Sequence, residues 1–312
     1  MSGRTKTIIY RVIDIVLLLA AGAGLVLMWY FSGQGEIWMC AVDVAVFLFL
    51  PLHILVHELG HVLAGSVTGM RFFSFRVGNF TVSRVRGKVR VRYADSGLTA
   101  GESSFCPKSA PHVRGRFVFT ALGGAALNLI YAAVFFALYF VLPAHPALLV
   151  FEMFAPFNLY EGIMALYPAE LPAGKTDGKV ALGLIRGNAE ELVALRVLTA
   201  QGILHRETFD KVPRELLFCM PVVREDLHAY HALLLLRAEY LLATGEEEGA
   251  RGELERLKGL FEYLSEEERA EATRYLAYFE GAFTEGDEPL FGIRALETML
   301  LEKQKSSEKD RT

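Results

Sequence analysis

Cysteine is scarce in this chain, with only Cys40, Cys106 and Cys219 among 312 residues. No two of them form a CxxC pair, so the cysteines indicate neither a disulfide framework nor a cysteine zinc site.

The chain also lacks an excess of basic residues. Its 32 Lys and Arg stand against 36 Asp and Glu, for a formal net charge of −4. This balance gives no reason to expect a nucleic-acid partner.

Apolar sequence, in contrast, is abundant. Hydrophobic residues make up 53% of the chain, which is high for a soluble protein and low for a chain that lies wholly within a membrane. The apolar runs are concentrated before residue 168, and charged residues dominate the later sequence. The composition therefore predicts a membrane half followed by a soluble half.

The apolar runs predict about four transmembrane spans, because a bilayer core of ~30 Å needs about 20 apolar residues in a helix. The predicted spans cover residues 13–31, 37–64, 117–142 and 147–167. The small residues at 20–24 resemble a signal-peptide cleavage region, but the apolar run continues beyond them, which favours a span.

The basic residues predict the orientation of these spans. The N-terminal tail and the segment 71–116 are rich in Lys and Arg, whereas the turns at 32–36 and 143–146 contain none. We therefore expect an integral, multi-pass membrane protein with both termini in the cytoplasm.

The second span contains the motif His57-Glu58-Leu59-Gly60-His61. Residues four apart lie on one face of a helix, so the two imidazoles can bind one Zn²⁺. The adjacent Glu58 can then deprotonate a water molecule activated by the metal. A chance match is the alternative, but three ionisable groups in an apolar helix are costly without a function.

His53 precedes His57 by one helical turn and continues the same stripe. It is either a further ligand or a polar residue lining the site, and we favour the lining role.

Beyond the motif, residues 73–77, 82–86 and 89–93 alternate with period two, which predicts a β-hairpin preceded by a third strand. Arginines on one face of the last two strands suit anionic lipid head groups or a sheet edge that pairs with an extended substrate. The segment 94–116 is expected to be a polar loop.

The last two spans carry polar residues among small or helix-breaking ones. Small residues at 123–127 allow close helix packing, and Asn128 serves either packing or the lining of an active site. The span 147–167 contains Asn158 and Glu161, and its polarity predicts that it lines a cavity.

Helical periodicity returns after residue 180. A helix over 233–244 stopped by Gly245, followed by one over 246–261, indicates either tetratricopeptide-like helix pairs or a plain helical bundle. We expect four parts: a first span and turn at 1–36, a membrane core at 37–180, a cytoplasmic helical domain at 181–302 and a charged tail at 303–312.

Over residues 37–180, these motifs resemble the site-2 protease family of intramembrane zinc metalloproteases. The HExxH sequence matches the family's first motif, the segment 123–128 resembles its next core helix, and Asp177-Gly178 resembles the Asp-Gly of its last motif. The resemblance implies zinc on His57, His61 and Asp177, with Glu58 as the base.

The chain departs from the family pattern in the last motif. The family has Asn-x-x-Pro followed closely by Asp-Gly, whereas here Ala165 occupies the Asn position and the gap from Pro168 to Asp177 is longer. Glu161 is therefore a rival third ligand.

The resemblance implies a mainly α polytopic membrane bundle with a small β-hairpin after the HExxH helix. It also implies a zinc protease of regulated intramembrane proteolysis that cuts a membrane protein within or near a transmembrane segment. The expected partners are the substrate, the lipid bilayer and a protein bound by the C-terminal helical domain. The alternative is an inactive zinc-binding scaffold that recruits a partner, although the intact Glu58 argues against it.

Overall fold

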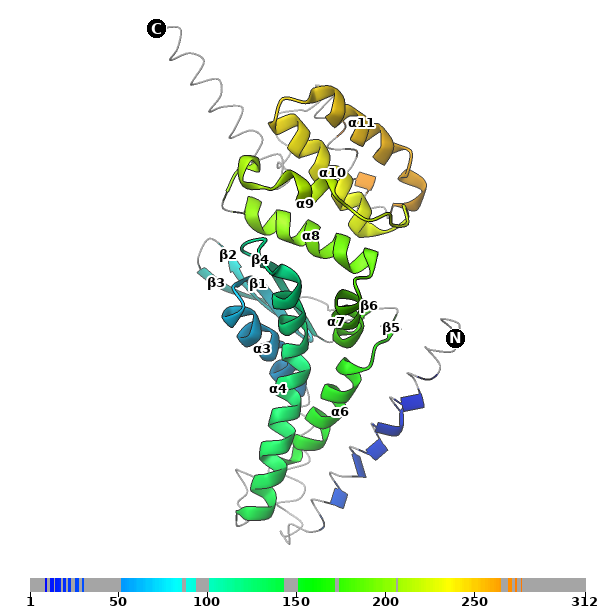
Figure 1. The fold of residues 1–312 in the computed structure, drawn as a ribbon. Helices are drawn as coiled ribbons and strands as arrows, with labels where there is room; N and C mark the ends of the chain where they lie inside the picture. The colour runs from blue at the N-terminus through cyan, green and yellow to red at the C-terminus, as the bar shows by residue number, and fades with distance from the viewer. Residues whose placement is uncertain are drawn as a thin grey trace. The chain divides into compact units, whose positions relative to one another are not determined.

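The computed structural model describes residues 52–85, 88–93, 101–142, 151–171, 174–205 and 207–264, with scattered helical positions between 9 and 30 and between 269 and 276 (Figure 1). The predicted first span, the first part of the second span, the turn at 143–146 and the tail at 303–312 lie wholly or largely outside these residues. The described part is mainly helical and contains a small antiparallel sheet.

The chain divides into two compact units. One comprises Met1–Cys106 and Pro111–Arg186, and the other comprises Pro107–Ala110 and Gly187–Thr312. The predicted division after residue 180 falls inside helix α7 (Asp177–Arg186), which belongs to the first unit.

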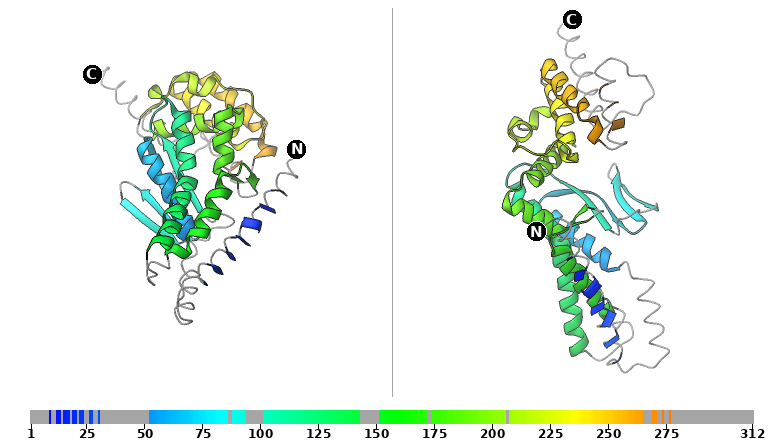
Figure 2. Two further views of the ribbon diagram at one scale, coloured as in Figure 1. Left: turned by 60° about the horizontal axis from the view of Figure 1, so that its bottom comes forward. Right: turned by 90° about the vertical axis from the view of Figure 1, so that its right-hand side faces the viewer.

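Three further helices form the framework of the first unit: α3 (Leu52–Val67), α4 (Val113–Val141) and α6 (Ala155–Leu166). Helix α4 packs against each of α3, α6 and α7, and Figure 2 shows α6 running beside it. A methyl group on Gly60 would collide with the Gly123 backbone. The small residues therefore let α3 and α4 approach backbone to backbone at the HExxH motif.

Two arginines in the first turn of α4 tie its neighbours to it. Nε of Arg116 donates to the Thr68 carbonyl at 2.6 Å, and Nη2 of Arg114 donates to the Ile185 carbonyl at 2.7 Å. These bonds satisfy carbonyl groups at the ends of α3 and α7, which have no partner within their own helices.

The sheet contains β1 (Met70–Val77), β2 (Phe80–Val85), β3 (Lys88–Tyr93) and β4 (Gly101–Pro107), in the order β3-β2-β1-β4. The first three are antiparallel neighbours in the predicted region, with Val82 opposite both Phe75 and Val91. The prediction of a loop over 94–116 was wrong at β4. This strand lacks apolar alternation because its polar side chains bind Arg76 and Glu58 instead of filling a core.

One described helix, α4, is long and apolar enough to cross a membrane. Its 29 residues exceed the length that a bilayer core requires, and only 22% of its most apolar stretch is buried within the protein. The described part of helix α3 is also apolar but is shorter than a candidate membrane span. Helix α6 begins at Ala155, inside the predicted fourth span, with Pro156 in its first turn, where proline is tolerated.

The second unit is helical over its described residues: α8 (Ala189–Leu204), η1 (Phe209–Lys211), α9 (Arg214–Phe218), α10 (His228–Ala243), α11 (Glu247–Lys258) and η2 (Phe261–Tyr263). Helix α10 packs on α8 and α11. Its Leu233 and Leu234 are buried in a core with Val193 of α8 and Leu257 of α11. Gly245, at φ 83°, ends α10 as predicted.

Candidate metal centre

The HExxH motif lies on α3 with its ionisable side chains buried. His57, Glu58 and His61 are each less than 10% exposed. The two histidines point to the same side of the helix, and their Nε2 atoms are 3.1 Å apart. Two of the predicted ligands therefore converge, as the i, i+4 spacing requires.

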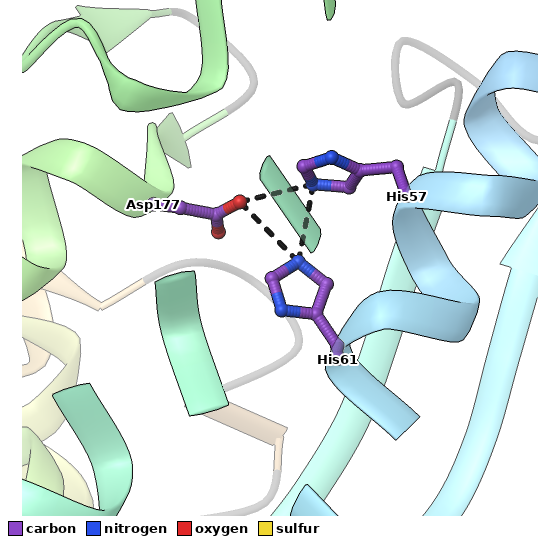
Figure 3. Close-up of side chains that lie close together, drawn as sticks. All are labelled: His57, His61 and Asp177. Atoms are coloured by element: carbon purple, nitrogen blue, oxygen red, sulfur yellow. Dashed lines mark hydrogen bonds and ion pairs between the residues drawn. The ribbon is translucent and has the colours of Figure 1, made fainter. Parts of the chain in front are cut away.

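Asp177, the first residue of α7, meets both imidazoles (Figure 3). Its Oδ2 atom lies 2.9 Å from Nε2 of His57 and 3.3 Å from Nε2 of His61. Ligand atoms at ~2.0–2.1 Å from a tetrahedral metal are about 3.3 Å apart. The three atoms therefore match one face of such a site and could hold a metal ion with a fourth position left for another ligand.

A hydrogen bond orients His61. Its Nδ1 lies 2.9 Å from the buried carbonyl oxygen of Thr120 on α4, so Nδ1 carries the proton and donates it. In the neutral imidazole, Nε2 is then an acceptor that faces His57 and Asp177. A metal ion, or a proton in its absence, would satisfy the acceptor atoms that face one another at this point.

Asn128 of α4 lies behind His57. The Nδ2 atom of Asn128 is 3.5 Å from His57 Nδ1, and its buried Oδ1 has no hydrogen-bond partner. Rotating the amide by half a turn brings Oδ1 to the imidazole, where it can accept the Nδ1 proton. His57 Nε2 then keeps its lone pair for a metal. Asn128 thus faces the candidate ligand.

Thr176 fixes the position of Asp177. Its Oγ1 donates to the Tyr167 carbonyl at 2.7 Å and accepts from the backbone N–H of Ala169 at 3.1 Å. These contacts close the loop after α6, which contains the short antiparallel strands β5 (Glu170–Leu171) and β6 (Gly174–Lys175). The small hairpin accommodates the long gap between Pro168 and Asp177.

Gly178 allows α7 to begin against the end of α6. A methyl group on Gly178 would collide with the Leu166 carbonyl. The Asp-Gly pair therefore combines a candidate ligand, Asp177, with a glycine at the position where any side chain would collide with α6.

Two opposing influences set the pKa of Asp177. Burial raises it, but hydrogen bonds and charge interactions with His57 and His61 lower it, through a proton on imidazole Nε2 when no metal is bound, and the result is a pKa of about 2. The group is therefore a carboxylate at neutral pH, the form that binds a metal.

Strand β4 holds the Glu58 carboxylate. The Ser103 hydroxyl donates to Glu58 Oε2, and a methyl group on Gly101 would collide with Glu58 Oε1. The β4 backbone therefore passes directly beside the candidate base. No sequence pattern predicts these contacts, because they join residues more than 40 positions apart.

Gly124 leaves space beside the imidazoles. A methyl group on this residue would lie 2.6 Å from His61 Nε2 and 2.7 Å from His57 Nε2. The second glycine of the Gly-Gly pair thus keeps the α4 backbone clear of the nitrogen atoms that would bind a metal.

The candidate ligands open into a cavity of about 600 Å³. Elements α3, α6, β4 and the β5–β6 hairpin contribute to its walls. Glu161, the rival third ligand, lines this cavity but pairs with His53 and does not belong to the metal-binding group. Asn158 is buried, and its Nδ2 donates to the Phe154 carbonyl in the preceding turn at 2.9 Å.

Comparisons with known proteins found no matching family model, curated protein or solved structure.

Proposed function

We propose that this protein is an intramembrane zinc metalloprotease of the site-2 protease type, which hydrolyses peptide bonds within or near a transmembrane segment of a membrane protein. The observation that carries the proposal is the convergence of His57, His61 and Asp177 within one cavity, with Glu58 beside them. Two imidazoles, one carboxylate and an open fourth position are typical of catalytic zinc.

Zinc suits this donor set, because imidazole nitrogen and carboxylate oxygen are common zinc ligands. When bound, the ion polarises a peptide carbonyl and lowers the pKa of a water ligand towards ~7. Glu58 takes the proton of the attacking water and delivers it to the leaving amine. Ser103 holds the Glu58 carboxylate through its hydroxyl group.

The substrate must be unwound, because a helix hides its carbonyl groups in internal hydrogen bonds. Strand β4 supports a specific way of holding such a segment, since it is the last strand of the sheet and lines the cavity. An extended peptide can add to a sheet edge through main-chain hydrogen bonds. This moves the proposed substrate contact from the 71–93 region to β4.

The membrane setting is proposed as four spans at 13–31, 37–64, 117–142 and 147–167, with both termini in the cytoplasm. The low burial of α4 supports it, since a long apolar helix within a water-soluble core is mostly buried. The metal group then lies near the cytoplasmic face.

Zinc content tests the site. We expect about one zinc per chain in the purified full-length protein by elemental analysis. Asp177→Ala should lose it, because a site with two imidazoles alone binds far more weakly. Glu161→Ala is the matched control and should retain the metal, since Glu161 faces His53. A metal-free wild type, after zinc addition and removal of excess, would refute the proposal.

Hydrolysis tests the role of Glu58. With a single-span peptide in vesicles, Glu58→Gln should lower the cleavage rate by at least about 10²-fold while retaining zinc. An inactive scaffold, the second candidate function, predicts that the wild type binds zinc and cleaves none of a panel of such peptides. Equal cleavage by wild type and Glu58→Gln would instead refute the proposed mechanism.

A further inference from the structure

A second pair of ionisable side chains lines the cavity beside the metal-binding group. His53 Nε2 of α3 and Glu161 Oε2 of α6 lie 4.0 Å apart, with their side chains 12% and 29% exposed. His53 is one helical turn before His57. Neither residue belongs to the group that could hold a metal, so the pair is a separate polar feature of the same cavity.

The spacing of the pair suits a third polar group. A separation of 4.0 Å exceeds that of a direct hydrogen bond. The Glu161 carboxylate has four lone-pair sites, so it can accept from a donor that enters the cavity. Placing ionisable groups among apolar helices is costly, and such groups mark functional positions in membrane proteins.

Strand β4 gives the direction in which an extended substrate passes this pair. Along β4, Gly101 lies against Ile54 and Glu58, and the ring centroid of Phe105 lies 6.3 Å from that of His61. Strand β4 and helix α3 therefore advance in the same direction past the candidate metal ligands. A peptide added to the β4 edge runs along the line from His53 to His61 in one sense or the other.

The rise of α3 between His53 and His57 is close to the distance that an extended peptide advances over two residues. From His53 to His57 an α-helix rises ~6 Å. Two residues of extended peptide advance ~6.6–6.8 Å, and their side chains point to the same face. A substrate side chain two positions from the residue above the metal-binding group therefore faces His53 and Glu161.

We propose that His53 and Glu161 form a side-chain subsite that takes a hydrogen-bond-donating residue, such as Lys or Ser, about two positions from the cleaved bond, and that rejects an acidic residue. This inference rests on the proposed protease function. Glu161 attracts a donor and repels a carboxylate, and His53 lies opposite it to contact the same side chain.

The test uses the zinc-loaded full-length protein in vesicles with single-span peptides. A set with a randomised central segment locates the cleaved bond by mass spectrometry. Matched peptides then carry Lys, Ser, Leu or Glu two positions from that bond on either side. For the substitutions on one of the two sides of the cleaved bond, we expect the wild type to cleave the Lys and Ser peptides fastest and the Glu peptide slowest. Glu161→Gln should reduce the preference for Lys over Glu by about tenfold.

Charge reversal makes the test sharper. Glu161→Lys should invert the order, so that the Glu peptide is cleaved faster than the Lys peptide. Glu102→Gln is the matched control, because Glu102 of β4 also lines the cavity but pairs with Arg76 of β1 at 2.6 Å. This control should rank the peptides as the wild type does.

The outcomes separate the two proposals. If the wild type cleaves peptides but Glu161→Lys ranks them in the wild-type order, the subsite is refuted and the protease function stands. Loss of zinc from Glu161→Gln would make Glu161 a ligand and also refute the subsite. If the zinc-loaded wild type cleaves no peptide, the protease function fails, and the subsite fails with it.

Discussion

Two buried histidine environments in this protein differ in what their ring nitrogens face. In the second unit, His231 of α10 is 3% exposed, and its Nε2 donates to the Glu225 carbonyl at 2.7 Å. In the first unit, the Nε2 atoms of His57 and His61 face each other and a carboxylate. Nε2 of His231 has a backbone acceptor, whereas the Nε2 atoms of His57 and His61 converge with a carboxylate oxygen on a point that a cation could occupy. Burial alone therefore does not mark a histidine as a candidate metal ligand, but convergence with other possible ligand atoms does.

Removal of one histidine from each environment should give the largest difference between the two. His61→Ala should lower zinc affinity by more than ~100-fold, because even the loss of a group behind a ligand costs 10–100-fold. His231→Ala should leave zinc content unchanged and lower the free energy of unfolding by about 1–3 kcal/mol, through the lost hydrogen bond and the cavity that remains.

Chelator competition and denaturant unfolding of both variants provide these measurements. Equal zinc affinities in His61→Ala and His231→Ala would contradict the distinction between the two environments.

Removal of the Asn128 amide, which lies behind His57, should have a smaller effect on zinc affinity. Asn128→Ala should reduce zinc affinity by about 10–100-fold, since groups that orient a ligand have effects of this size. Asn158→Ala is the control, because that buried amide bonds its own helix. Both variants remove a buried amide, so a difference between them in chelator competition reports the contact with His57. Equal affinities would show that Asn128 serves packing alone.

The smallest effect is expected at Ser103. Ser103→Ala removes the hydroxyl group that holds Glu58 but leaves the three candidate ligands in place. We expect the cleavage rate to fall by about threefold to tenfold, the value of one hydrogen bond, with zinc content unchanged. The measurement is the rate on the single-span peptide used for Glu58→Gln. A loss as large as that of Glu58→Gln would mean that Ser103 itself takes part in the reaction.

The sequence predicts those features whose residues lie only a few positions apart in the chain. The i, i+4 relation of His57 and His61 sets their common face on any helix, and period-two alternation located strands β1–β3. Asp177 has no such signal, because it is 116 residues beyond His61, and only the family resemblance selected it over Glu161.

The parts that the sequence misses depend on contacts between distant segments. The Thr120 carbonyl meets His61 from 59 positions away, and Ser103 meets Glu58 from 45 positions away. A backbone carbonyl has no sequence signature, and Ser103 lies in a segment without apolar periodicity. Thr176 is similar, since its importance comes from the loop that it closes back onto Tyr167.

A side chain on Gly124 of α4 would remove the candidate metal site without changing any of its ligands. A single methyl group there would occupy space within contact of both Nε2 atoms, the volume that a bound ion requires. All ligands, the base and the loop that carries Asp177 would keep their sequence, yet the ion would be excluded. The proposed capacity for metal thus depends on an unfilled volume as much as on the three side chains that surround it.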